Sequence, residues 1–562
     1  MLNDSLNSGI VYPQVRSLFS KYENVDNHAL SSFISSVPNF FSEAVKIMQS
    51  PAITRDPNYL SSEFNLNNKL KLRKAVSNFH RGANTLTLKV IDAIEILTDP
   101  STQIFVSTHQ PNLFAYGGIF KKIVLLQTLK YTLENVDRNQ RIINLFIIID
   151  HDFMDETWIR VAQLPSIRHN SGILDLRFPV SKSKKWILVC NMPLPGRMIL
   201  DKWKGQIMSW TRSFQSNNKF NKSDLLSNLD YLWSIVEEAY SNAKSYSEFN
   251  SFIVSNLVNK VMDYDTLFVR LTDMSSVFED GFQYLISNFN RYSKVLENAR
   301  NVFLEFGVDD AGISSNSHLH VPLWLHCKCG SKASIRICHG SDSRISLRGA
   351  CMSCKKDVGI VLENNGTRNI PNDILHGLTP KAIPILLLLS KDIGISCYCS
   401  GSGGVGYMAY ASIAFAELGI KMPFTIFWPA RDINLGIGQT EALEALQLKN
   451  QGEVAVYLQQ LEKSHDDYKY KITPIIKQRS KIVKSKENEQ IRSVLFDLFS
   501  LKEGQREVRR LIKVANKVNN ILELKPSIID YAINFGIAEA ESQWRNSLLT
   551  DGNLATPILL SK

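Results

Sequence analysis

The strongest constraint on this chain is a pair of apolar, strand-like segments that flank a helix-like one. Residues 104–106 are Ile-Phe-Val, and residues 142–149 read IINLFIII. Between them, Ile119, Ile123 and Leu126 recur at the spacing of one helix face. A nearly continuous apolar strand that follows a crossover helix is typical of a parallel sheet covered on both faces. The pattern therefore predicts an α/β fold built on a parallel sheet.

Polar residues fill the loop after the first of these strands. His109, Gln110 and Asn112 supply hydrogen-bonding groups, and Gly117 and Gly118 stand where the helix is expected to begin. Glycines at that place leave backbone amides open to an anionic ligand. A loop histidine is a candidate acid, base or anion ligand, or alternatively a residue that only stabilises the turn. Ligands of open α/β sheets bind beyond the carboxyl ends of the strands, so this loop is the first candidate for a site.

Ionisable residues close the second strand. Asp150, His151 and Asp152 follow it directly, and Asp155 and Glu156 come shortly after. Such groups are costly at the end of a buried strand unless they are solvated or paired, which indicates a cleft. Strand alternation would turn Asp150 and Asp152 to one side and His151 to the other. Helix capping by Asp152 or Asp155 is the structural alternative.

A glycine-rich turn occupies residues 400–406, SGSGGVG, and precedes Tyr407. Glycines between a strand and a helix let backbone amides surround an anion, which makes Ser402, Gly403 and Gly404 candidate ligands. The turn is not a phosphate-binding loop of the Walker type, because no Lys-Ser or Lys-Thr pair follows it. A close-packed turn without a ligand is the alternative. Around the turn the pattern predicts a strand at 393–398, a helix at 407–418 and a strand at 424–428.

Four of the eight cysteines form two close pairs, Cys327 with Cys329 and Cys351 with Cys354. Two such pairs separated by a short β-type segment are typical of a zinc ribbon, in which four thiolates close a tetrahedral shell and the metal is structural. The first pair has one intervening residue where two are usual, so further residues are alternative ligands: Cys338, His326 and His339.

Residues 491–522 carry apolar side chains near heptad positions, with basic clusters at 477–486 and 506–517. This predicts a long helix in a coiled coil, either within one chain or in a homodimer, or an amphipathic helix on the core.

The N-terminus lacks the features of a secretion signal, and the longest apolar run, 383–389, is too short to cross a bilayer. The expected location is the cytoplasm, with no membrane partner.

Three segments in chain order resemble the cysteine-adding enzyme family of bacillithiol biosynthesis: THQPNLFAYGGIFKKI, FIIIDHDFMDE and YCSGSGGVGYMAYASIAFAELGIKMPFTIFWPARD. That family has a Gln-rich loop before a helix, an acidic strand end and a Gly-rich turn before a Tyr-bearing helix. A Met-Pro pair and an Arg follow, matched by Met422, Pro423 and Arg431. The chain differs in having His109, in lacking an acidic residue after the glycine turn, and in its cysteine module, and so resembles a divergent member.

The resemblance implies a Rossmann-like core related to class I nucleotidyltransferases. It also implies amide formation between the carboxyl group of cysteine and the amine of glucosaminyl malate or a similar small acceptor. By motif match, these residues would line the pocket: His109, Gln110, Asn112, Asp150, His151, Asp152, Gly403, Gly404 and Tyr407.

Amide formation requires an activated carboxyl group and a base for the amine proton. We expect the glycine turn and the His109 loop to hold anionic oxygens, while Asp150 or Asp152 orients and deprotonates the amine. ATP is a candidate activator.

The 562 residues exceed the usual size of one core, so insertions are expected. The predicted parts are an N-terminal helical layer (1–100), the Rossmann-like core (101–200 and 366–440), a helical insertion (201–320), a zinc ribbon (321–365), a long helical or coiled-coil region (441–525) and a C-terminal tail (526–562).

A second hypothesis is a protein that binds tRNA or another nucleic acid. A net charge of +10, a zinc ribbon and a basic helix suit an anionic partner. The sequence contains no base-stacking aromatic motif such as an RNA-recognition octapeptide, so the enzyme is favoured.

Overall fold

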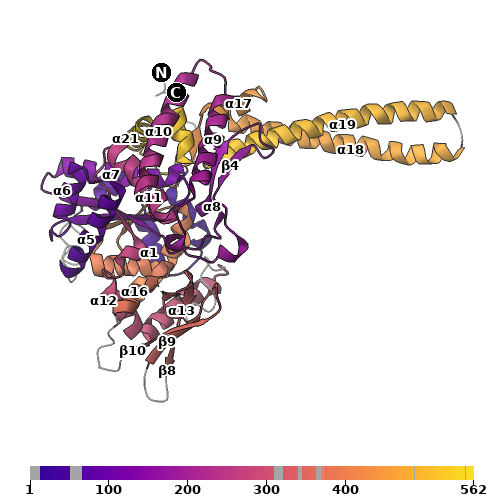
Figure 1. Cartoon of the computed structure of the whole chain (residues 1–562). Coiled ribbons are helices and arrows are strands. Elements are labelled where there is room, and N and C mark those ends of the chain that lie inside the picture. Colours follow the sequence, from indigo (N-terminus) through magenta and orange to yellow (C-terminus); the bar gives the residue numbers. More distant parts are fainter. Residues whose placement is uncertain are drawn as a thin grey trace.

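The computed structural model describes residues 13–50, 66–308, 320–339, 345–362, 370, 372–485, 488–550 and 552–562. It shows a mixed α/β body from which one long helical hairpin projects (Figure 1). No helix in these ranges is both long enough and apolar enough to cross a bilayer.

A parallel sheet of five strands forms the centre of the body, in the order β13-β12-β1-β2-β5. The chain fills one side of β1 first and then returns to fill the other side with β12 and β13. The prediction of a parallel α/β sheet is confirmed. The bounds of the strands and of the first crossover helix are β1 Gln103–His109, α7 Gly117–Val136, β2 Ile142–Ile148, β5 Leu267–Arg270, β12 Cys397–Ser400 and β13 Phe424–Phe427.

The sheet forms where the sequence is apolar in both alternating positions. Every residue of β2 is buried, and the three predicted face residues of α7, Ile119, Ile123 and Leu126, are buried as well. The register pairs Ser107 of β1 with Cys399 of β12, and His109 of β1 with Ile148 of β2. The carboxyl ends of these three strands therefore lie at one edge of the sheet.

The strand expected at 393–398 begins later than predicted. The chain is helical from Ala382 through Ile393, first as α15 (Ala382–Leu388) and then as a π-turn. Gly394 ends it with a φ of 75°, in the left-handed region that glycine enters without a steric cost. Of the predicted strand, Ile393 ends the helical segment and only Cys397 and Tyr398 belong to β12. Periodicity does not separate a helix end from a strand over so short a run.

Helices pack around the sheet (Figure 1). The described residues between 13 and 96 form η1 Val15–Tyr22, α1 His28–Ser36, α2 Phe41–Met48, α5 Leu66–Ala83 and α6 Leu88–Ile96. Residues 157–305 form α8 Thr157–Arg160, β3 Val161–Pro165, β4 Ile173–Arg177, η2 Lys182–Lys184, η3 Val189–Asn191, α9 Arg197–Ser213, α10 Lys222–Asn242, α11 Tyr246–Asn256, η4 Leu257–Val261, η5 Leu271–Met274, α12 Glu279–Ser287 and α13 Phe289–Glu305.

The cysteine module consists of two small antiparallel sheets, ordered β10-β9-β8 and β11-β6-β7. The second includes a strand from beyond the module, β11, which pairs with β6. The elements are β6 Leu323–His326, β7 Lys332–Ser334, β8 Arg336–His339, β9 Ile345–Ala350, β10 Asp357–Leu362, α14 Asn372–Leu375 and β11 Leu378–Pro380.

The predicted coiled-coil helix is α19 (Asn488–Glu523), and it packs along α18 (Gln451–Ser485) of the same chain (Figure 1). Its coiled-coil partner is therefore intramolecular. Buried residues at the base fix the hairpin to α17 (Ile437–Glu444): Ala442, Leu443, Val454, Val518 and Ile521.

The segment expected to be a C-terminal tail is instead part of the core. It forms α20 (Ile528–Asn534), α21 (Ile537–Thr550) and β15 (Ile558–Leu560), which pairs with β14 (Asp432–Asn434). Tyr531 and Trp544 are buried in it. Their large apolar area explains why this segment folds onto the body.

Candidate functional site

The loops that follow β1, β2 and β12 meet at one edge of the sheet. Gln110 donates a hydrogen bond from Nε2 to Oδ2 of Asp152 at 2.8 Å, which joins the loops after β1 and β2. Lys122 of α7 donates from Nζ to the carbonyl of Thr108 at 3.0 Å, and its side chain also lies against Gly401 in the loop after β12. The loops that carry the three predicted motifs are thus neighbours.

Asp152 is the more accessible of the two predicted carboxylates. Its side chain is 29% exposed, and its Oδ1 lies 3.8 Å from Nε2 of His151 and 3.9 Å from Nζ of Lys332. A carboxylate that faces solvent between a hydrogen-bond donor and a cation is able to orient an incoming amine and accept its proton.

Asp150 is completely buried and points elsewhere. It accepts hydrogen bonds from the backbone amide of Thr272 at 3.2 Å, from the Thr272 hydroxyl at 2.7 Å and from the Ser247 hydroxyl at 3.4 Å. Burial raises its pKa to about 6, although Arg270 nearby acts in the opposite direction. The expectation that Asp150 and Asp152 share one side is wrong, because β2 ends at Ile148 and the alternation ends with it.

The capping alternative for the acidic stretch is not realised. Helix α8 follows Glu156, and no side chain caps its N-terminus.

Both predicted histidines are uncharged at neutral pH. His109 contacts the Tyr116 hydroxyl through Nε2 at 3.0 Å and the Gln110 carbonyl through Nδ1 at 3.1 Å. Burial, together with the charge of Lys122, lowers the pKa of His109 to about 3. The pKa of buried His151 also lies well below its ordinary value, because of burial and of Lys332. His109 therefore serves as a neutral hydrogen-bonding group.

Asn112 and the two glycines of α7 have packing roles in the structure. Asn112 is buried and donates to the carbonyl of Trp158. The amide of Gly117 donates to the carbonyl of Pro526, and a Cβ at Gly117 would lie 2.7 Å from the ring of Tyr531. A Cβ at Gly118 would lie 2.5 Å from the ring of Tyr116. The expectation of a free amide at Gly117 is wrong, because that amide donates to Pro526, and the Tyr531 ring fills the space beside the glycine.

The glycine turn lies at the start of a helix, as predicted. Ser402–Gly404 forms a short 3-10 turn, η8, and α16 (Val405–Leu418) follows at once. The Gly404 amide is already bonded to the carbonyl of Gly401. The turn borders an open pocket lined by Leu18, Lys21, Ser402, Gly403, Val405 and Gly406.

Tyr407 and Arg431 have different relations to the glycine turn. Tyr407 is half-buried in the first turn of α16, one residue beyond the pocket lining. Arg431 donates to the carbonyl of Leu522 at the base of the hairpin, and no described contact joins it to the loops that carry Gln110 and Asp152.

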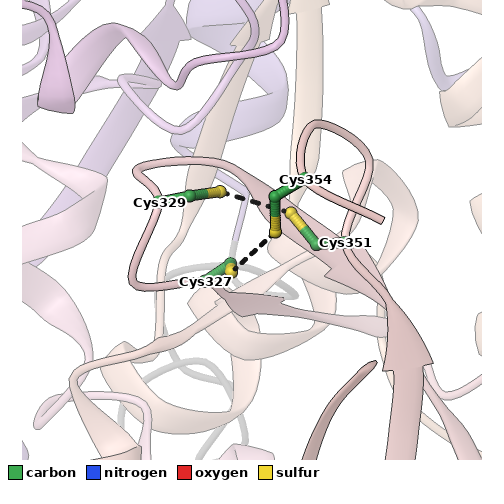
Figure 2. Close-up of side chains that lie close together, drawn as sticks. All are labelled: Cys327, Cys329, Cys351 and Cys354. Carbon is green, nitrogen blue, oxygen red and sulfur yellow. Dashed lines mark hydrogen bonds between the residues drawn. The ribbon is translucent and has the colours of Figure 1, made fainter. Parts of the chain in front are cut away.

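The four predicted cysteines gather at one point (Figure 2). Their sulfur atoms all lie within 4.8 Å of one another, with 3.7 Å between Cys327 and Cys354 and 3.5 Å between Cys329 and Cys351. Four sulfurs at about 2.3 Å from one zinc ion in a tetrahedron would be separated by about 3.8 Å. The cluster therefore has the donor type and the spacing to hold a metal ion.

The alternative ligands are not needed for this cluster. Cys338 is exposed on β8 and outside the group, and Nε2 of His326 contacts the Thr379 hydroxyl. The side chain of His339 lies outside the described residues.

Two lysines of this region are absent from the sequence-based predictions. Lys332, three residues after Cys329, is buried and donates from Nζ to the carbonyl of His151 at 2.8 Å. Its Nζ also lies 4.7 Å from the ring centre of Phe153 and 4.6 Å from that of Trp324. Burial lowers its pKa to about 8. The cysteine module thus supplies a cation to the loop that carries Asp152.

Only one of these lysines left a signal in the sequence. Lys122 stands with Lys121 in the middle of an otherwise apolar stretch of α7, and a charge there needs a partner. Lys121 has one in Asp432 at 2.9 Å, while Lys122 points toward the loops after β1 and β12.

Comparisons with known proteins give little further information. No protein-family model and no curated protein matches the chain. Among solved structures, the chain is similar to one from Campylobacter jejuni named "putative arginyl T-RNA synthetase". The sequence identity is 11%, the alignment covers 82% of this chain and 98% of the other, and the TM-score is 0.23. Similarity at this level supports no statement about activity.

Proposed function

We propose that this protein is a ligase that forms an amide between the carboxyl group of cysteine and the amine of an amino-sugar malate or a similar small acceptor. The observation that carries the proposal is the hydrogen bond between Gln110 and Asp152, made beside Lys122 and the glycine turn. It places the Asp152 carboxylate near Lys122 and the glycine turn, which we propose bind anionic oxygens. The reaction requires a base for the amine and groups that hold the anionic oxygens of the activated carboxyl group.

The sheet order supports a Rossmann-like core for this enzyme. In chain order the strands lie 5-4-1-2-3, the arrangement of the first five strands of a doubly wound nucleotide-binding fold. The order reverses between β1 and β12, where such folds bind their ligands. Lys122 and the N-terminus of α16 flank this point. They would hold the anionic oxygens of the activated carboxyl group, and ATP is the proposed activator.

Asp152 is the base of the proposed reaction. Asp150 already accepts hydrogen bonds from Thr272 and Ser247 and is closed to solvent, whereas Asp152 retains an exposed edge. The neutral imidazole of His109 would hydrogen-bond the substrate without adding charge. His151, whose Nε2 lies 3.8 Å from Oδ1 of Asp152, would help to position that carboxylate.

Zinc at Cys327, Cys329, Cys351 and Cys354 is proposed to be structural. Four thiolates leave no open coordination position for a substrate. The metal would hold the turn from which Lys332 reaches His151 and Asp152.

A ligation assay tests the proposal. Purified protein is mixed with ATP, cysteine and glucosaminyl malate, and the amide product is measured by mass spectrometry. Asp152→Asn should lose at least 100-fold in rate, the order of magnitude that a general base contributes (~10²–10⁴). Asp155→Asn is the matched control, since Asp155 is exposed and contacts only Lys185 at 3.7 Å among the described ion pairs. Equal loss in both variants, or none in Asp152→Asn, would refute the assignment of Asp152.

A further inference from the structure

The positive charge of this protein is concentrated on the projecting hairpin. Residues 468–517 contain 14 Lys and Arg residues and 5 Asp and Glu residues, a net charge of +9, whereas the whole chain has +10. The other 512 residues are therefore almost neutral. A uniformly basic protein would spread its charge, so this concentration indicates an anionic partner at the hairpin.

Large aromatic side chains are exposed on the same part of the hairpin. Tyr470 of α18 is 83% exposed, and Phe496 and Phe499 of α19 are 75% and 63% exposed. Phe496 and Phe499 are three residues apart and so lie on neighbouring positions of the helix surface. Lys469 and Lys471 flank Tyr470 in the sequence.

Packing of the hairpin does not require these aromatic residues. The seam between the two helices is filled by other apolar side chains, among them Ile472, Val494 and Leu498, which are all buried. The helices run antiparallel (Figure 1), and Gly504 lies directly against the ring of Tyr468, from which a Cβ would be 2.7 Å away. Phe496 and Phe499 lie off this seam. Their exposure costs solubility without contributing to the fold, which is typical of an interaction site.

We propose that the hairpin surface formed by residues 468–477 and 493–517 binds single-stranded nucleic acid. These residues include 9 Lys and Arg residues and 3 Asp and Glu residues. Single-stranded nucleic acid is complementary to this surface in two ways. Its polyanionic backbone attracts the lysines and arginines, and its unpaired bases stack on exposed aromatic rings. A second copy of the hairpin would meet an equally basic surface and be repelled. Among the described side chains, exposed basic residues stand on both helices, Lys469, Lys471 and Lys477 on α18 and Lys502, Arg506 and Lys513 on α19, which suits an extended polyanionic strand. This inference is independent of the ligase activity of the body.

Fluorescence anisotropy on the full-length protein tests the proposal, with a labelled single-stranded RNA of about 20 nucleotides as the probe. Wild-type binding should weaken steeply between low and physiological salt, since counterion release dominates such binding. Lys502→Glu with Arg506→Glu, both exposed on α19, should weaken binding at least tenfold. Tyr470→Ala with Phe496→Ala and Phe499→Ala should do the same through lost stacking.

The matched control carries the same charge change on the body. Lys74→Glu with Lys202→Glu, exposed on α5 and α9, should leave RNA binding within twofold of the wild type. Circular dichroism verifies that each variant is folded, and ligation is measured in parallel, since it should be unaffected by the hairpin changes. The proposal is overturned if the wild type does not bind at low salt or if control and hairpin variants weaken equally. It is also overturned if the hairpin variants bind RNA as the wild type does and lose only the binding to anionic vesicles.

Discussion

Replacing Asp150 by Asn should make the protein more stable at neutral pH. Asp150 is fully buried, and burial raises its pKa from 3.8 to about 6. The asparagine oxygen can still accept from the Thr272 amide, and its Nδ2 can donate to the hydroxyls of Thr272 and Ser247, so all three contacts can persist. The substitution therefore removes the charge and retains the shape.

The size and pH range of the effect follow from the two pKa values. Because the folded pKa lies above the unfolded one, the carboxyl group destabilises the fold least below pH 3.8 and most above pH 6. The interval corresponds to about 3 kcal/mol, at roughly 1.4 kcal/mol per pH unit. Above pH 6 we expect Asp150→Asn to exceed the wild type by up to about this amount in free energy of unfolding, and the difference should vanish toward pH 4.

Urea unfolding of both proteins at several pH values between 4.5 and 8 is the assay. The difference in free energy between variant and wild type should grow with pH, while Asp155→Asn should show no such growth because Asp155 is exposed. A wild type that is more stable than Asp150→Asn at pH 8 would show that the buried carboxylate stabilises the fold, and the reasoning would fail.

Three further substitutions test other parts of the structure. Gly118→Ala should lower the free energy of unfolding, measured with urea, by about 1–3 kcal/mol, because its Cβ would overlap the Tyr116 ring. Gly205→Ala, with open space around the new Cβ, should stabilise the protein slightly, and equal effects of the two substitutions would contradict this packing. Cys354→Ser should remove the bound zinc measured by metal analysis and lower the melting temperature, and full zinc content in this variant would exclude Cys354 as a ligand. Lys332→Met should lose at least tenfold in ligation rate and remain as stable as the wild type, since burial of its charge is costly; unchanged turnover would remove Lys332 from the site.

Local patterns were sufficient to predict the parallel sheet and the cluster of four cysteines. The apolar run of β2 and the helical spacing in α7 are properties of contiguous residues, and so are the two cysteine pairs. The sequence also indicated that Gln110 and Asp152 lie close together, because each follows a parallel strand and the carboxyl ends of parallel strands lie at one edge of the sheet.

Contacts between distant segments could not be predicted in this way. A glycine is needed at position 117 because the Tyr531 ring packs against it. Lys332 reaches the carbonyl of His151 because the cysteine module packs against that loop. Asp150 and Asp152 have different partners because β2 ends two residues before Asp150, and the sequence does not mark where a strand ends. Each of these features requires tertiary structure.

Calorimetric titration with the amide product, cysteinyl glucosaminyl malate, tests most directly whether the three loops and the cysteine module form one site. We expect the wild type to bind the product and Gln110→Ala, Lys122→Met and Lys332→Met each to weaken binding at least tenfold, while Lys74→Glu does not. A wild type that fails to bind, or three variants that bind as the wild type does, would show that these residues do not form one site.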